Sequence, residues 1–144
     1  MQKVLDILFQ LYFFVVSAVV TPFFCLLTIS LGLCERVLGL KPRGVLAYYG
    51  VLGFAKTFFF LIPWWKVRIS GAQHLEGISK PCIIIANHQS ITDIFMMFFL
   101  NIPMRFLGKD SVFRTPLIGG AAKAAGYIPV KRGDRDSHRQ CSVS

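Results

Sequence analysis

The chain opens with a long apolar stretch. Residues 7–34 contain no Asp, Glu, Lys, Arg or His. At about 1.5 Å per residue, a helix of this length exceeds the roughly 30 Å hydrocarbon core of a bilayer. The pattern predicts a membrane-spanning helix that is retained as an anchor, because the run is longer than the roughly 7–15 apolar residues of a cleaved signal. Pro22 leaves open a re-entrant or tilted pair of helices that bends there.

A second apolar stretch covers residues 45–65. Lys56 interrupts it, and Trp64 and Trp65 lie at its end. This pattern predicts a helix that lies in or dips into the headgroup region, with the Trp pair as interfacial anchors. The alternative is a second span, because the ammonium of a single Lys can reach the interface.

After residue 66 the pattern changes to short apolar runs separated by polar turns. Strands are expected at residues 66–70, 82–86, 104–107 and 127–131, and helices at 94–100 and 116–125. Thr115-Pro116 predicts the start of the second helix and Gly126 its end. Alternating strands and helices imply a mostly parallel sheet. The predicted fold class is therefore α/β, with a membrane-anchoring helical region at 1–66 and a partial α/β domain at 67–144.

Composition and charge limit the classes of partner that the chain is expected to bind. Sixteen Lys and Arg against seven Asp and Glu give a formal charge of +9, and 54% of the residues are hydrophobic. This content excludes disorder and argues against an ordinary soluble domain. The basic residues are scattered among apolar runs, so a bilayer with anionic lipid or an anionic substrate is expected rather than nucleic acid. Arg36, Lys41 and Arg43 follow the first run and only Lys3 precedes it, which places the following domain in the cytosol.

The cysteines and histidines suggest no metal site. Cys25, Cys34, Cys82 and Cys141 form no C-x-x-C pair, and we expect all four to be reduced. The three histidines are scattered and lack the spacing of metal ligands.

The most specific chemical pattern is the segment from Asn87 to Asp93, which follows the expected strand at 82–86. Ligands of α/β sheets collect at the carboxyl ends of strands, where His88 would lie. A His is a plausible general base near neutral pH, and Asp93 would orient it and stabilise the imidazolium. The structural alternative is a capping box, in which Asp93 only satisfies the backbone donor of Ser90.

A basic stretch runs from Arg105 to Arg139, with eight Lys or Arg against three Asp. Lys109 and Arg132 each follow an expected strand, where they could contact a phosphate near His88. A solvated basic face that touches anionic lipid fits the same residues.

The segment from Asn87 to Asp93 resembles the H-x4-D motif of the glycerolipid acyltransferases, in particular the lysophosphatidic acid acyltransferases (1-acylglycerol-3-phosphate O-acyltransferases). The stretch that begins at Lys109 and continues through Pro116, Gly120 and Gly126 into the strand at 127 resembles the family's second motif block.

The resemblance implies transfer of a fatty acyl group from acyl-CoA or acyl carrier protein to the free hydroxyl of lysophosphatidic acid, which forms phosphatidic acid in phospholipid biosynthesis. It implies no metal, no tightly bound cofactor and no particular oligomeric state. It makes His88 the general base, Asp93 its orienting partner, and Lys109 and Arg132 contacts to the acceptor phosphate. Donors at the N-terminus of the following helix are expected to help hold the developing oxyanion.

The family's third motif, a Phe-Pro-Glu-Gly-Thr-Arg stretch, and its fourth, apolar motif are not found in these 144 residues. We therefore expect the chain to be an N-terminal portion of such an enzyme, with a truncated sheet. The second hypothesis is a catalytically inactive, membrane-bound remnant that binds lipid or a full-length relative.

Overall fold

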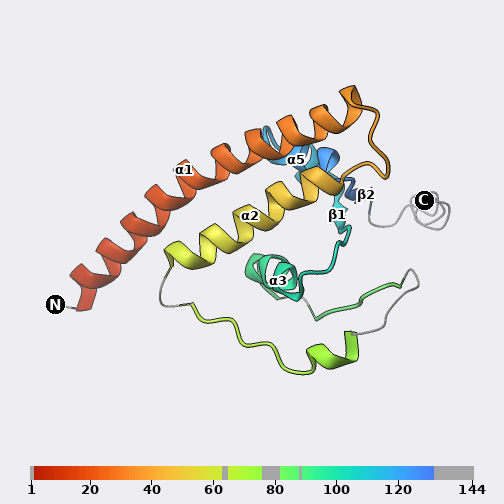
Figure 1. Cartoon of the computed structure of the whole chain (residues 1–144). Helices are drawn as coiled ribbons and strands as arrows, with labels where there is room; N and C mark the ends of the chain where they lie inside the picture. The colour runs from red at the N-terminus through yellow and green to blue at the C-terminus, as the bar shows by residue number, and fades with distance from the viewer. Residues whose placement is uncertain (1, 63–64, 76–81, 88, 132–144) are drawn as a thin grey trace.

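The computed structural model describes residues 2–62, 65–75, 82–87 and 89–131. Along the chain these form α1 (Gln2–Val37), α2 (Val45–Leu61), the 3-10 helix η1 (Ala72–Leu75), α3 (Ile91–Met97), the 3-10 helix η2 (Phe98–Leu100), β1 (Leu107–Lys109), α4 (Asp110–Phe113), α5 (Ile118–Ala124) and β2 (Ile128–Val130). Figure 1 shows α1 along one side of the molecule, α2 beside it, and the strands and α5 near the C-terminal end of α1. The chain is mostly helical, with a small parallel sheet.

The predicted N-terminal helix is confirmed as a single element. α1 continues for 36 residues, with Pro22 inside it, and Figure 1 shows it unbroken. The alternative of two helices that bend at Pro22 is therefore wrong. Loss of one amide donor at the proline does not end the helix, because the neighbouring turns keep their own hydrogen bonds. Within the described ranges, α1 is the one helix long and apolar enough to cross a membrane by length and composition.

α2 is shorter than the roughly 20 residues that a span requires. It lies between α1 and α3, and aromatic side chains fill the contact with α3. The rings of Phe54 and Phe95 pack edge to face, with their centroids 5.1 Å apart. Lys56, the charge that interrupts this helix, donates from Nζ to Asn101 Oδ1 at 2.8 Å. The helix is confirmed, and its place at headgroup level stays a prediction.

A buried carboxylate joins the end of α1 to the start of α2. Glu35 is only 2% exposed. Its Oε2 accepts the backbone N–H of Gly44 at 2.7 Å, and its Oε1 accepts that of Leu46. The first amides of a helix lack partners within the helix, and negative charge is favourable there. Gly44, the N-cap residue with φ 88°, has no side chain for this task, so Glu35 supplies the cap from the preceding helix.

α5 docks against the same junction through small residues. A Cβ on Gly32 of α1 would lie 2.8 Å from Cβ of Ala124. A Cβ on Gly44 would lie 3.1 Å from the carbonyl oxygen of Ala125. These approaches leave no room for larger side chains, so the helical N-terminal region and the following domain share one tightly packed contact.

The sheet has two parallel strands in the part of the chain that is described. β1 pairs with β2 in the register Leu107 to Ile128 and Lys109 to Val130. The strand expected at 127–131 is confirmed, whereas the one expected at 104–107 lies about three residues too early. Tyr48 supports the approach to β1, because its hydroxyl donates to the carbonyl oxygen of Ile102 at 2.9 Å.

Two expected strands are absent from the described fold. Residues 66–70 and 82–86 form no regular structure. Ile83 and Ile85 are 88% and 92% exposed, although a β-branched run is typical of a strand covered on both faces. A strand also needs a neighbour for its amides and carbonyls, and no described strand pairs with either segment. The predicted α/β class therefore holds only in its coarser form, a helical chain with a small parallel sheet.

The boundaries of the two later helices also differ from expectation. α3 starts at Ile91, earlier than the predicted residue 94, and gives way to η2 before Asn101. α5 starts at Ile118 because the chain first turns through Leu117, with φ 60°. Thr115 is thus not the N-cap. Gly126, with φ 74°, ends α5 as predicted.

We expect Glu35→Ala to lower the free energy of unfolding by about 2 kcal/mol, because two backbone donors lose a charged acceptor. Chemical unfolding in detergent micelles, followed by circular dichroism, measures the change. Glu35→Gln keeps one acceptor oxygen and should cost less. Asp6→Ala removes a charge from the exposed start of α1 and serves as the control. Equal stability of Glu35→Ala and Asp6→Ala would contradict a capping role.

Tyr127 carries a hydroxyl that is buried and has no hydrogen-bond partner among the described residues. Burial, and secondarily the nearby Tyr48, raises the pKa of Tyr127 above its ordinary value. The unfolded chain then loses this proton first, so stability should fall as pH rises above about 10. We expect Tyr127→Phe to raise the free energy of unfolding by about 1 kcal/mol at neutral pH and to reduce the alkaline loss. The exposed Tyr49→Phe is the control, and an unchanged alkaline profile for Tyr127→Phe would contradict this account.

Candidate active site

The N-terminus of α3 is a reciprocal capping box. Ser90 is extended, with φ −140° and ψ 150°, and its Oγ accepts the backbone N–H of Thr92 at 3.4 Å. Asp93 reaches back, and its Oδ2 accepts the N–H groups of Gln89 and Ser90, each at 2.8 Å. The capping box predicted from the sequence is confirmed, and the catalytic role of Asp93 stays a prediction.

The expectation that amides at the start of α3 help to hold an oxyanion stays a prediction, and three of the amides in this turn already have partners. The N–H groups of Gln89 and Ser90 are bonded to Asp93, and that of Thr92 is bonded to Ser90. A side chain therefore already occupies each of these donors.

The capping bonds also fix where the Asp93 carboxylate lies. Both end on Oδ2, so the carboxylate is held against the backbone of the turn that leads into α3. His88 belongs to this turn in sequence but lies outside the described residues. Its pairing with Asp93 stays a prediction.

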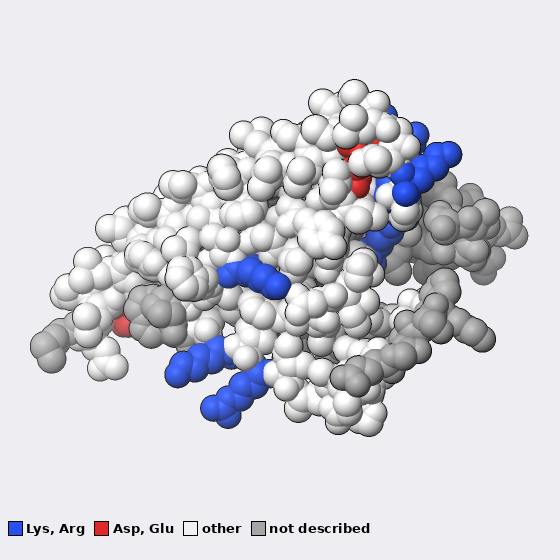
Figure 2. Space-filling model, viewed as in Figure 1, with Lys and Arg blue, Asp and Glu red and all other residues white. Residues whose placement is uncertain are grey.

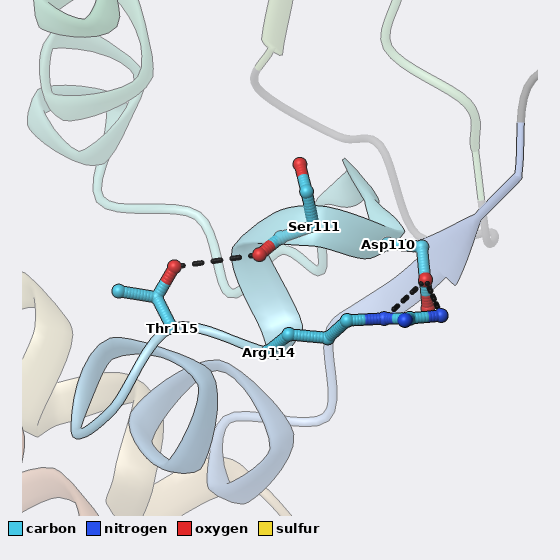
Figure 3. Close-up of polar contacts among 4 residues, drawn as sticks. All are labelled: Asp110, Ser111, Arg114 and Thr115. Atoms are coloured by element: carbon cyan, nitrogen blue, oxygen red, sulfur yellow. Dashed lines mark hydrogen bonds and ion pairs between the residues drawn. The ribbon is translucent and has the colours of Figure 1, made fainter.

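Lys109 lies at the carboxyl end of β1, and its side chain is exposed. Figure 3 shows the short helix α4 that follows it. There Arg114 turns back onto Asp110, with Nε at 2.8 Å and Nη2 at 2.7 Å from Oδ2. Thr115 Oγ1 donates to the carbonyl oxygen of Ser111 at 3.3 Å. Because Arg114 pairs with Asp110, the carboxylate adjacent to Lys109 in sequence is already neutralised.

Lys131 joins Lys109 at the same edge of the sheet. Lys109 pairs with Val130 in the parallel register, and Lys131 is the next residue. Its side chain is exposed. The strand expected at 127–131 contains Lys131, so the sequence places this residue only in the basic stretch. β2 ends at Val130, and Lys131 directly follows it. Arg132 lies outside the described residues.

The described residues thus place Asp93 and Lys109 on separate elements, at the start of α3 and at the end of β1. Phe95 of α3 and Phe98 of η2 pack into the aromatic cluster that also includes Phe106, just before β1. The two elements therefore share one core. No three His, Cys, Asp or Glu side chains within the described ranges come together as a metal site.

Comparison with known proteins adds the decisive observation. Residues 66–143, more than half of the chain, match the Acyltransferase family. The chain belongs to this family. The match includes the segment from Asn87 to Asp93 and both strands of the sheet. The resemblance inferred from those residues is therefore confirmed.

Curated members of the acyltransferase family align with about half of the chain. A 1-acyl-sn-glycerol-3-phosphate acyltransferase of Chlamydomonas reinhardtii is 39% identical over 79 residues, which are 55% of this chain and 24% of that protein. The chloroplastic enzyme BAT2 of Brassica napus, of the same name, is 35% identical over 81 residues, 56% of this chain and 24% of that protein. A lyso-ornithine lipid O-acyltransferase of Pseudomonas aeruginosa is 36% identical over 83 residues, 54% of this chain and 32% of that protein.

The chain thus spans about a quarter to a third of the length of these relatives. No solved structure matches it. All three relatives are named as acyltransferases, and the names differ in the acceptor, which is 1-acyl-sn-glycerol-3-phosphate in two of them and a lyso-ornithine lipid in the third.

The capping role of Asp93 can be separated from catalysis. We expect Asp93→Asn to cost about 1 kcal/mol of unfolding free energy, because the amide caps less well than the carboxylate at a helix N-terminus. If capping were its only role, acyl transfer by the folded protein would persist. Ser90→Ala disrupts the other half of the same box and is the matched control. Near-complete loss of transfer in Asp93→Asn alone, at equal stability, would assign Asp93 a role beyond capping.

Proposed function

We propose that this chain transfers a fatty acyl group from acyl-CoA or acyl carrier protein to the free hydroxyl of lysophosphatidic acid and forms phosphatidic acid. The observation that supports this most strongly is the acyltransferase match over residues 66–143, which includes the His88 to Asp93 motif. Relatives from Chlamydomonas and Brassica bear the name of this reaction. The exposed Lys109 and Lys131, which lie at one edge of the sheet, are suited to bind the phosphate of lysophosphatidic acid.

In the proposed mechanism, His88 takes the proton of the acceptor hydroxyl while that oxygen attacks the thioester carbonyl. The ester C–O bond forms, the C–S bond breaks, and the proton on His88 passes to the leaving sulfur. Asp93 orients the imidazole and stabilises its charged form. Lys109 and Arg132 hold the acceptor phosphate by charge-assisted hydrogen bonds. Each turnover therefore regenerates the neutral imidazole.

We further propose that α1 anchors the protein in a membrane with the acyltransferase domain on the cytosolic side. Only 6% of the most apolar 18-residue segment of α1 is buried within the protein. A core helix of a soluble domain would be mostly covered. Arg36 in its last turn and the basic residues that follow agree with the charge bias of cytosolic segments. A lysolipid acceptor would then reach the site from the bilayer surface.

Substitution of His88 tests the reaction directly. We expect His88→Ala to abolish formation of phosphatidic acid from labelled acyl-CoA and lysophosphatidic acid in isolated membranes, because the acceptor loses its base. The matched control is His74→Ala, in the exposed 3-10 helix η1. If membranes with the wild-type chain and membranes with His88→Ala formed only the same background amount of phosphatidic acid, the proposal for this chain would be overturned. That result, with both proteins present in the membrane, would favour the inactive remnant.

A further inference from the structure

A second basic site lies away from the candidate active site. A cavity of about 210 Å³ opens between the end of α1, the start of α2, the end of α5 and the segment that leads into β1. Its charged lining consists of Arg36, Arg43, Arg105, Lys123 and Glu35. Three glycines and one alanine supply the rest of the wall, so backbone and guanidinium groups are accessible from inside.

The described residues do not balance the positive charge of this cavity. The Glu35 carboxylate is already bonded to the backbone N–H groups at the start of α2. Among the described residues, the ion pair of Arg114 with Asp110 lies on α4, and no described carboxylate pairs with the four cations. Arg105 is held in place, because its Nη2 donates to the carbonyl oxygen of Arg43 at 2.9 Å. Four cations thus face one occupied carboxylate.

The cavity lies at the opposite edge of the sheet from the proposed acceptor site. Arg105 precedes β1 by two residues, and Gly126 precedes β2 by two. Both are therefore at the amino ends of parallel strands, whereas Lys109 and Lys131 are at the carboxyl ends. A three-residue strand is about 10 Å long. The residues that line the cavity do not include Lys109, Lys131 or Asp93.

The cavity also lies where α1 would leave a bilayer. The uncharged run of α1 ends at Cys34, and Arg36 follows in the last turn. Figure 2 shows Lys and Arg side chains gathered where α1 ends and α2 begins, while the surface along the middle of α1 is uncharged in this view. Basic pockets beside the cytosolic ends of membrane helices are suited to anionic headgroups.

We propose that this cavity binds the phosphate of an anionic phospholipid headgroup, at a site separate from acyl transfer. Two or more guanidinium groups can clamp phosphate oxygens through paired N–H donors, and the low carboxylate content leaves those donors available. The inference requires α1 to lie in a membrane and does not depend on the identity of the acyl acceptor. Free phosphate presents the same oxygens, so the experiment compares both sources.

The full chain in detergent micelles is titrated calorimetrically with dihexanoyl phosphatidylglycerol, which is neither acceptor nor product of the proposed reaction. Dihexanoyl phosphatidylcholine and inorganic phosphate are the comparison ligands. We expect phosphatidylglycerol to bind more tightly than both. The double variant Arg36→Gln with Lys123→Gln, whose side chains are exposed and carry no fold-supporting bond, should weaken that binding at least about tenfold, because charge-assisted hydrogen bonds are lost.

The matched control is the double variant Lys109→Gln with Lys131→Gln, which removes the same charge from the other edge of the sheet. It should retain phosphatidylglycerol binding, and circular dichroism should show both variants folded. Equal weakening by the two variants would overturn the proposal in favour of general charge attraction. Inorganic phosphate that binds as tightly as phosphatidylglycerol would overturn the lipid assignment.

Discussion

The rest of the structure depends on the bonds that the Glu35 carboxylate makes to the first amides of α2. A buried carboxylate is costly unless its oxygens are satisfied, and here two backbone donors satisfy it. The same contact fixes the start of α2 against the end of α1. α5 then packs on this turn through Gly32 and Gly44. One junction therefore orients the apolar hairpin and the acyltransferase domain relative to each other.

This junction explains why the two edges of the small sheet differ. The amino ends of β1 and β2 face the turn between α1 and α2, so Arg105 reaches the carbonyl oxygen of Arg43. The carboxyl ends point away from it and carry Lys109 and Lys131 in exposed positions. Parallel strands make this separation unavoidable, because all their amino ends lie together. Arg105 and Lys109 are close in sequence but therefore lie at opposite ends of β1.

Local patterns predicted local structure well. The uncharged run predicted α1, Gly126 predicted the end of α5, and the spacing from Ser90 to Asp93 predicted a capping box. Each of these depends on a few neighbouring residues. The glycine needs only a positive φ, and the box needs only a Ser and an Asp three residues apart.

Features that depend on distant partners could not be predicted in this way. Glu35 caps a helix across a turn, and nothing in its own sequence neighbourhood indicates an amide partner. The β-branched run at 82–86 has strand composition, yet a strand exists only where a neighbour pairs with it. For the candidate site, the sequence selected Asp93 and Lys109, but not Lys131, whose position depends on the register of two strands.

The aromatic contact between α2 and α3 links the candidate site to the apolar N-terminal helices. Phe54 meets Phe95 one turn after the capping box, and Tyr48 bonds to Ile102 beyond η2. α2 thus contacts α3 through Phe54 and the segment after η2 through Tyr48, while Glu35 of α1 caps the start of α2. The start of α3, where Asp93 is fixed, is therefore set at a defined height along the apolar helix α1. Under the proposed function, with α1 in the bilayer and a lysolipid acceptor, this packing would hold the general base near the depth of the lipid hydroxyl.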